Sequence, residues 1–289
     1  MTPVCEVAID TSVLGPLSDD KHLLDDFLAQ VESKQLRVVV PFKVGWEALV
    51  CGNVTVAPSL ASVLLEILSC KKTNAIVGGD YGVISTEELK GTQIFCTPKM
   101  LRDHTENLIG ALWHTSQCGP NKQIVKAADD YLDKNKRIDD SKKLAVLALS
   151  CLEKGNHSLY DQFRVNPISV AIDLDDEIGL IKKLLPDETS LKTVQSTPYC
   201  YPFIMAFCML ILHRDIGQIA KTVDDEKRNN FYRKTDPNDH CDDSIAACSI
   251  YASVFLSNDK RQRRDFDFVA EKLGRNVRSS TLDDFLKRT

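Results

Sequence analysis

The sequence predicts an α/β fold in which a mainly parallel sheet lies between layers of helices. Two observations lead to this class. Short apolar runs that suit buried strands alternate with segments whose apolar residues recur at helical spacing. A strand, a helix and a second strand also fit within residues 4–40, which indicates a right-handed crossover and a parallel pair of strands.

The N-terminal part of the chain supplies two clear strands, at residues 4–9 and 36–40. The first is mostly apolar, as expected of a central strand that is covered on both faces. Ser18 is expected to cap the helix between them, and Ile109 is expected to face inward from a later helix. Other predicted elements are helices from Pro41, over 58–69 and from Thr97, a turn at 78–80 and a third strand at 92–96.

The C-terminal part adds two predicted strands. A helix that opens at Asp243 leads to an apolar strand at 254–256, and a short edge strand is expected at 276–278. Residues 266–273 and a last helix capped by Thr281 complete this part.

The pattern between these two parts is different. From residue 116 to about residue 235 the chain is mainly helical and contains several Asn and Pro breaks. We therefore expect a discontinuous core, formed by residues 1–115 and 236–289, with a helical insertion at 116–235. The insertion could serve as a lid, a specificity module or a docking surface for a protein partner.

Composition sets limits on the kind of partner. The net charge is −5, so binding to a polyanion would need a local basic patch. No secretory signal is visible, and the longest apolar run, residues 203–212, is too short to span a bilayer. We therefore expect no membrane contact and a cytoplasmic location. Ten cysteines without a Cys-x-x-Cys pair favour reduced thiols over disulfides.

Four acidic residues that are far apart in the sequence are predicted to meet at one edge of the sheet. Asp10 follows the first strand and Asp259 follows a later one, and parallel strands end at a common edge where ligands bind. Glu47 lies early in the helix after the second strand, and Asp243 opens the helix before residue 254. Oxygen ligands of this kind suit Mg²⁺ or Mn²⁺, and two such ions can activate water against a phosphodiester.

These acids also have structural explanations. Asp239, Asp242 and Asp243 could cap a helix, and Asp10 could head a turn. We regard Asp239 and Asp242 as less favoured metal ligands than the four acids above.

Two kinds of polar neighbour could support the site. The densest basic cluster in the chain directly follows Asp259, and contact with a phosphate backbone needs such a cluster. A solvated loop is the alternative explanation of the cluster. The residues predicted to contact nucleic acid are Lys260, Arg261, Arg263, Arg264 and Lys43, and the hydroxyls predicted to bond a ligand carboxylate or metal-bound water are Ser12 and Ser257.

These segments resemble the PIN-domain nucleases, the fold of many prokaryotic toxin ribonucleases. The matching residues are 9–14, 40–49, 243–247, 256–259 and 277–285, and their order agrees with the family. The resemblance implies a PIN-like three-layer α/β/α fold, enlarged here by the helical insertion.

The resemblance also implies a function and a set of site residues. Asp10, Glu47, Asp243 and Asp259 would be the catalytic, metal-binding acids of an Mg²⁺- or Mn²⁺-dependent endoribonuclease. The protein would act on RNA, as the toxin of a toxin–antitoxin pair or in defence, and an antitoxin or another protein could bind the insertion. A homo-oligomer is a further possibility.

Three alternatives stand beside this interpretation. Asp140 and Asp161 repeat part of the pattern of Asp243 and Asp259 and could complete the site instead, although no closing strand and helix follow them directly. The chain could also be a non-catalytic PIN-like scaffold that binds RNA or protein. A phosphatase of the haloacid-dehalogenase type is rejected because its second Asp would stand where this chain has Ser12.

Overall fold

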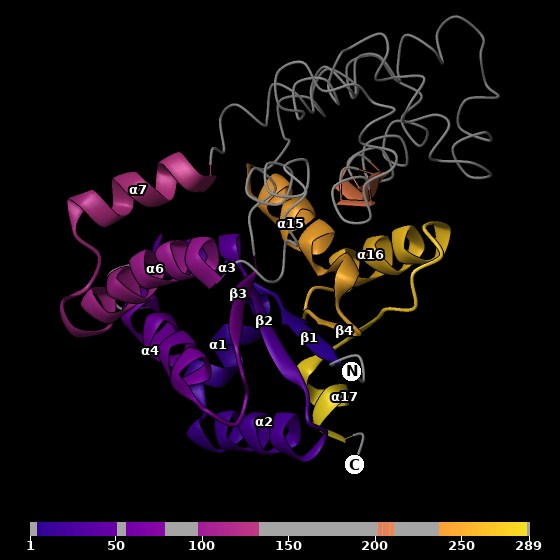
Figure 1. Cartoon of the computed structure of the whole chain (residues 1–289), viewed down its shortest axis with the longest axis horizontal. Coiled ribbons are helices and arrows are strands. Elements are labelled where there is room, and N and C mark those ends of the chain that lie inside the picture. Colours follow the sequence, from indigo (N-terminus) through magenta and orange to yellow (C-terminus); the bar gives the residue numbers. More distant parts are fainter. Residues whose placement is uncertain are drawn as a thin grey trace, which may run out of the picture.

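The structure is a computed structural model that describes residues 5–50, 56–78, 98–132, 202–203, 205–207, 209–210 and 237–287. Within these ranges the chain forms a five-stranded sheet in which all neighbouring strands are parallel. Helices flank the sheet (Figure 1). The predicted α/β class with a parallel central sheet is confirmed, and the arrangement is compatible with three layers.

The strand order places the first strand at the centre, as β3-β2-β1-β4-β5. The strands are β1 (Glu6–Ile9), β2 (Arg37–Pro41), β3 (Ile76–Gly78), β4 (Val254–Leu256) and β5 (Arg278–Ser280). The chain adds β2 and β3 on one side of β1 and then adds β4 and β5 on the other side. The order therefore reverses between β1 and β4, and in open α/β sheets ligands bind at such a switch point.

Two helices follow β1, namely α1 (Thr11–Asp19) and α2 (Lys21–Ser33). The cap predicted at Ser18 is wrong. Asp20 caps α2, because its carboxylate accepts hydrogen bonds from the first backbone N–H groups of that helix. Ser18 lies inside α1 instead, where its hydroxyl group donates to the carbonyl of Gly15 at 2.8 Å.

The helices after β2 pack closely on one another. They are α3 (Phe42–Val50) and α4 (Val56–Ser69), followed after β3 by α6 (Pro98–Cys118) and α7 (Lys122–Leu132). A Cβ atom on Gly45 would lie only 2.5 Å from a methyl carbon of Leu108. Glycine therefore lets α6 approach the backbone of α3, the helix that also carries Glu47.

Three helices belong to the C-terminal part: α15 (Pro237–Cys248), α16 (Lys260–Lys272) and α17 (Leu282–Lys287). α15 begins six residues earlier than predicted, with a proline in the first helical position, so Asp243 lies in mid-helix. α16 also begins earlier, so the basic cluster forms its first turns rather than a loop. The cap predicted at Thr281 is confirmed, since its hydroxyl accepts from the N–H of Asp284 at 3.0 Å.

Aromatic contacts join the two ends of the chain into one core. The rings of Phe255 on β4 and Phe266 on α16 are 4.6 Å apart, and both side chains are buried. The ring centroids of Phe27 on α2 and Phe285 on α17 are 6.0 Å apart. Figure 1 accordingly shows the yellow α17 beside the indigo α2. Residues from both ends of the chain therefore belong to one hydrophobic core.

Several sequence expectations need correction. The third strand of the sheet is Ile76–Gly78, where a turn was predicted from residue 78, and the strand predicted at 92–96 lies outside the described residues. β5 begins two residues later than predicted, although it is an edge strand as expected. Ile109 was expected in the core, but its side chain is 36% exposed.

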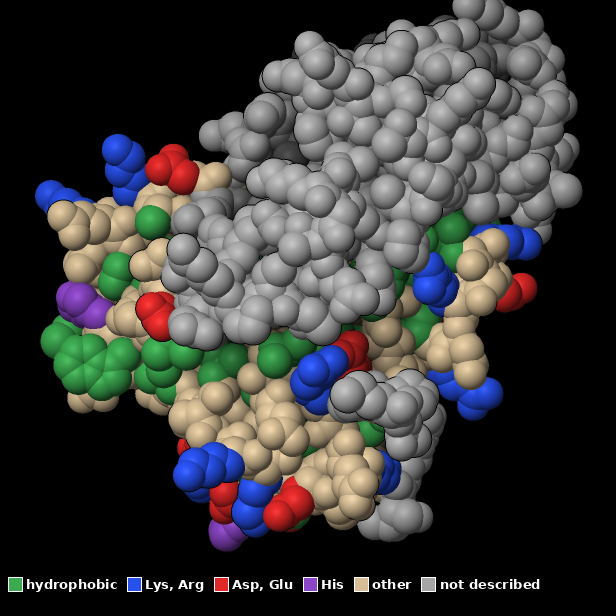
Figure 2. Space-filling model, viewed as in Figure 1, with side chains coloured by type: hydrophobic (Ala, Val, Ile, Leu, Met, Phe, Trp, Pro, Cys, Tyr) green, Lys and Arg blue, Asp and Glu red, His purple; other side chains and the backbone are tan. Residues whose placement is uncertain are grey.

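The exposed side of α6 carries apolar side chains. Trp113, one turn after Ile109, is 64% exposed, and Val125 on α7 is 37% exposed. Figure 2 shows hydrophobic side chains gathered at the left edge of the molecule, where Figure 1 places α6 and α7.

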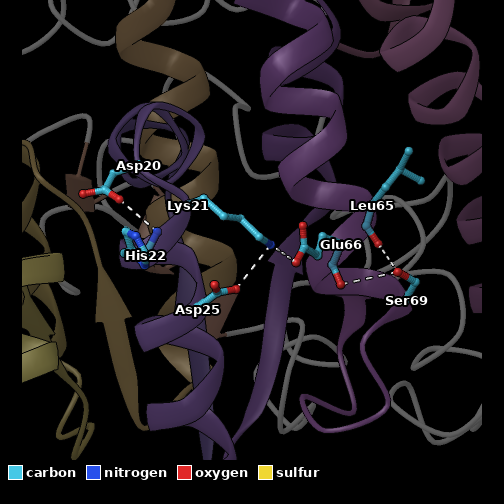
Figure 3. A network of polar contacts seen from close by, with 7 residues as sticks. All are labelled: Asp20, Lys21, His22, Asp25, Leu65, Glu66 and Ser69. Carbon is cyan, nitrogen blue, oxygen red and sulfur yellow. Dashed lines mark hydrogen bonds and ion pairs between the residues drawn. The ribbon is translucent and has the colours of Figure 1, made fainter.

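An exposed ion pair connects α2 to α4 (Figure 3). The ammonium group of Lys21 donates to Glu66 and lies 3.3 Å from a carboxylate oxygen of Asp25. The hydrogen bond to Glu66 is the main cause that raises the pKa of Lys21 above its usual 10.5. Ion pairs this exposed contribute little to stability.

Most of the insertion expected at 116–235 lies outside the described residues, and Asp140 and Asp161 lie there too. The described pieces of it are helical apart from residues 119–121, and they include α7 and the buried residues Phe203, Met205, Ala206, Phe207, Met209 and Leu210. None of the described helices combines the length and the apolar character needed to cross a membrane.

Candidate functional site

Asp10 lies at the switch point of the sheet. It follows the last residue of β1, and its N–H group donates to the carbonyl of Leu256 on β4 at 2.9 Å. Its side chain caps α1 and is only 3% exposed. A carboxylate in this position is held by rigid elements on both sides, which is the arrangement that a binding or catalytic site requires.

Two serine hydroxyls hold this carboxylate and join the ends of β1 and β4. Ser12 Oγ donates to Asp10 Oδ2 at 2.5 Å, and Ser257 Oγ lies 3.1 Å from the same oxygen. Ser12 Oγ accepts from the N–H of Asn258 at 2.9 Å, and Ser257 Oγ accepts from the N–H of Asp259 at 3.1 Å. Each hydroxyl therefore connects residues that follow β1 with residues that follow β4.

Asp259 lies on the same edge of the sheet as Asp10, to which it is linked through Ser257. Its side chain is exposed and caps α16, where Oδ1 accepts from the N–H groups of Arg261 at 2.6 Å and Gln262 at 2.9 Å. Asp259 therefore serves as the N-cap of α16 at the end of β4.

Glu47 is tied to the residue that follows Asp10. The hydroxyl group of Thr11 donates to Glu47 Oε2 at 2.5 Å across 36 residues of chain. Glu47 lies on α3 and is partly buried. This hydrogen bond joins α3 to the residue that follows Asp10.

Asp243 is attached to the site less directly. It is 7% exposed in the middle of α15. The carbonyl of the preceding residue, Asp242, accepts from Gln262 Nε2 at 3.3 Å, which places this turn of α15 near Asp10. The Asp242 side chain is half-buried, and the side chain of Asp239 is outside the part of the chain that is described.

Gln262 is a site residue that sequence reasoning missed. It is 7% exposed, and its side chain contacts Asp10, Ser257 and α15. A signal was present, because an Asp cap followed three residues later by Gln is the spacing of a capping box. In that motif Gln turns back to the N–H of the cap residue. Here the N–H of Asp259 donates to Ser257, and Gln262 turns to Asp10.

The basic cluster divides into two groups. Arg263 Nη1 donates to the carbonyl of Ser257 at 2.6 Å, and Arg264 pairs with Asp265 at 2.8 Å, so both support the local structure. Lys260 and Arg261 are exposed beside Asp259. The fifth residue predicted to contact nucleic acid, Lys43, is 3% exposed and therefore does not extend this surface.

The fit of a divalent cation is incomplete in this arrangement. Among the described residues, no group of three or more His, Cys, Asp or Glu side chains lies close enough to hold a metal. The chemistry of the donors nevertheless suits Mg²⁺. Both oxygens of Asp10 have partners within the described chain, since Oδ2 accepts from Ser12 and Oδ1 lies 3.4 Å from Gln262 Nε2. Asp259 uses only Oδ1 in the hydrogen bonds of the described residues.

The molecule is thus an α/β protein with a cluster of acids and hydroxyls at the switch point of a parallel sheet. No protein-family model, curated protein or solved structure matches the chain. Any function must therefore be argued from this site.

Proposed function

We propose that this protein is a metal-dependent endoribonuclease of the PIN type, which hydrolyses RNA at the carboxyl edge of the sheet. The observation that carries the proposal is the link from Asp10 through Ser257 to Asp259 at the switch point. The hydrogen bond from Thr11 to Glu47 connects a third acid, on α3, to the residue that follows Asp10. The resemblance to PIN-domain nucleases, stated for the same acids, supports the same reaction.

In this proposal Asp10, Glu47, Asp243 and Asp259 would hold Mg²⁺ or Mn²⁺. The ions would supply an activated water and stabilise the leaving oxygen of the phosphodiester. The contribution of the protein is orientation. Ser12 donates to Asp10 Oδ2 and Gln262 Nε2 lies 3.4 Å from Oδ1, so little conformational freedom of this carboxylate remains to be lost on binding.

Lys260 and Arg261 would bind the RNA backbone. Both are exposed on the first turn of α16, directly after Asp259, in a chain whose net charge is −5. Phosphate contacts of this kind position a strand without reading its sequence. The roles as a toxin or in defence, with an antitoxin bound to the insertion, belong to the same proposal and rest on the family resemblance.

A second candidate is a non-catalytic scaffold that binds RNA or protein through the same surface. One observation favours it, namely the absence of a three-residue metal cluster in the described ranges. In that case Asp10 and Asp259 would serve only as helix caps, which both of them are.

A charge-removing substitution that preserves capping separates the two candidates. Asn caps helices as well as Asp does, so Asp10→Asn preserves the cap of α1 and removes one negative charge. Because its NH₂ group would face Gln262 Nε2, thermal unfolding of the variant accompanies the assay. We expect the wild type to cleave labelled single-stranded RNA with Mn²⁺, and Asp10→Asn to lose at least about a hundredfold in rate. Asp129→Asn, an exposed position on α7, is the control and should cleave like the wild type. RNA binding without cleavage by every protein would favour the scaffold instead.

A further inference from the structure

One face of α16 combines basic and aromatic side chains. Residues three or four positions apart lie on the same face of a helix. Four residues of α16 follow this spacing, namely Arg261, Arg264, Phe268 and Lys272. The first two are exposed and the other two are half-buried. Figure 2 shows Lys and Arg side chains at the right-hand end of the molecule, where Figure 1 places α16.

The turn that ends α16 extends this face to a second aromatic ring. The N–H of Arg275 donates to the carbonyl of Ala270 at 2.9 Å, as in a Schellman motif. Gly274 supplies the positive φ of 63° that this turn requires. Beyond the turn, the guanidinium carbon of Arg275 lies 5.6 Å from the ring centroid of Tyr251, which is half-buried.

A second cation lies over the other ring, since Lys272 Nζ is 5.7 Å from the ring centroid of Phe268. A cation at this distance is attracted to the face of the ring. Unpaired bases stack on aromatic rings and on the plane of an Arg guanidinium group. Positive charge and a stacking surface therefore occur together at two places. We call the following six residues the basic face of α16: Arg261, Arg264, Phe268, Lys272, Arg275 and Tyr251.

The charge of this segment is opposite to that of the chain. Residues 260–275 contain six Lys or Arg and three acidic residues, whereas the net charge of the whole chain is −5. Asp265 is buried and pairs with Arg264, whose side chain is 68% exposed, so the positive partner of this pair faces solvent. Asp267 is hydrogen-bonded to β5. Glu271 is the exposed acid of the segment.

Helix stability does not explain the basic residues at the start of α16. The positive end of the helix dipole disfavours cations in the first turn. The helix nevertheless begins with Lys260 and Arg261, and Arg264 follows one turn later. Lys272 differs, because it lies in the last turn, where the dipole favours a cation. Binding of a polyanion gives the N-terminal charges a role that the fold does not.

We propose that the basic face of α16 binds single-stranded RNA, with phosphates along the basic residues and unpaired bases against the rings of Phe268 and Tyr251. A helix of 13 residues is about 20 Å long, so the strand would run from Asp259 to the turn at Gly274. Bases that are paired in a duplex are not free to stack on these rings. The inference rests on the proposed function in taking RNA as the ligand, but it requires no metal ion and no cleavage.

The first test measures RNA binding in EDTA, so that no metal-dependent cleavage occurs. Fluorescence anisotropy follows a labelled single-stranded oligouridylate at several salt concentrations. Lys272→Gln/Arg275→Gln, at the end of the basic face far from Asp259, should lower the slope of log affinity against log salt by about 1.4. Lys122→Gln/Lys126→Gln removes two exposed charges on α7 and should keep the wild-type slope. An unchanged slope in Lys272→Gln/Arg275→Gln would overturn the proposal.

The second test concerns stacking. Tyr251→Phe keeps the ring and should bind the single strand like the wild type, whereas Tyr251→Leu keeps only apolar bulk and should lose about fivefold or more in affinity. Affinity for duplex RNA should be the same in both variants. Thermal unfolding checks the fold of Tyr251→Leu, and Phe268→Leu repeats the test at the second ring if that variant does not fold. Equal affinity of the Leu and Phe variants for the single strand would contradict the proposal.

The outcomes also separate this inference from the proposed nuclease. RNA that binds through α16 in EDTA but is not cleaved with Mn²⁺ would refute the nuclease and support the basic face. Cleavage with unchanged RNA affinity in Lys272→Gln/Arg275→Gln would do the reverse. A poly-glutamate peptide that displaces labelled RNA as strongly as unlabelled RNA does would overturn the inference too, because the face would then recognise negative charge alone.

Discussion

The hydroxyl group of Ser257 lies 3.1 Å from the carboxylate of Asp10, although 247 residues separate them in the chain. This contact spans the point where the strand order of the sheet reverses. It links the N-terminal and C-terminal parts of the chain, which are separated in the sequence by more than a hundred residues. The two halves therefore share polar contacts as well as a hydrophobic core.

Ser257→Ala is expected to destabilise the protein. Ser257 is fully buried, and its removal leaves the N–H of Asp259 without its acceptor and Oε1 of Gln262 without its donor. Buried polar groups that lose their partners cost about 1–3 kcal/mol. Urea denaturation should detect this loss, whereas Ser62→Ala, at an exposed position on α4, should stay within about 0.5 kcal/mol of the wild type. Equal stability of Ser257→Ala and the wild type would contradict the bridging role.

Two glycines in helices make a matched pair for the packing of α3 against α6. Gly110 has nothing within 4 Å of an added Cβ, so Gly110→Ala should stabilise the protein by up to about 1 kcal/mol through helix propensity. Gly45→Ala gains the same propensity but places a methyl group 2.5 Å from Leu108. Overpacking of this kind costs about 1–3 kcal/mol, so the net change should be destabilising or near zero. The melting temperatures of both variants, measured by thermal unfolding, test this expectation. A higher melting temperature for Gly45→Ala than for the wild type would mean that Leu108 moves aside easily.

The sequence was sufficient for most of the sheet because strands buried on both faces are apolar throughout. Residues 4–9, 36–40 and 254–256 were predicted for this reason, and all three are central or next to the centre. β3 was missed because it has only three residues and ends at Gly78, which looked like the start of a turn. In so short a strand, local turn propensity outweighs the apolar signal.

The position of a site residue could be predicted where it follows a strand. It could not be predicted where it depends on which hydrogen-bond partner a side chain takes. Asp10 and Asp259 follow strands, so parallel topology alone brings them to one edge. Gln262 was not foreseen, because its contact with Asp10 depends on Ser257 occupying the N–H of the Asp259 cap. Lys43 is buried although lysine is usually exposed, and composition gives no sign of such a position.

The ion pair between Lys21 on α2 and Glu66 on α4 should add a small amount to the free energy of unfolding, and this amount should disappear at alkaline pH. The pKa of Lys21 is raised in the folded protein, mainly by its hydrogen bond to Glu66. The contribution is therefore fully present below the unfolded pKa of 10.5 and is lost as the pH rises through the higher folded value. The stability difference between the wild type and Lys21→Met, measured by urea denaturation, should shrink over that interval and also in high salt. Lys122→Met, at an exposed position on α7, should show no such trend.

Neutralising Lys260 and Arg261 should weaken RNA binding. Lys260 and Arg261 lie at the N-terminus of α16, where the helix dipole disfavours positive charge, so Lys260→Gln should leave stability equal or slightly higher. If both residues contact phosphates, Lys260→Gln/Arg261→Gln should reduce the slope of log affinity against log salt by about 1.4 for a single-stranded RNA.

Fluorescence anisotropy at several salt concentrations measures this slope, with Asp10→Asn as the protein background so that RNA is not cleaved during the titration. Lys122→Gln/Lys126→Gln, an exposed pair on α7, removes the same charge away from the site and should keep the wild-type slope. If both double variants lower the slope equally, the attraction of RNA depends on the net charge of the protein and not on the location of the lysines and arginines. RNA would then not lie beside Asp259. A loss confined to the pair on α16 instead places the phosphate backbone next to the acids that the proposed reaction needs.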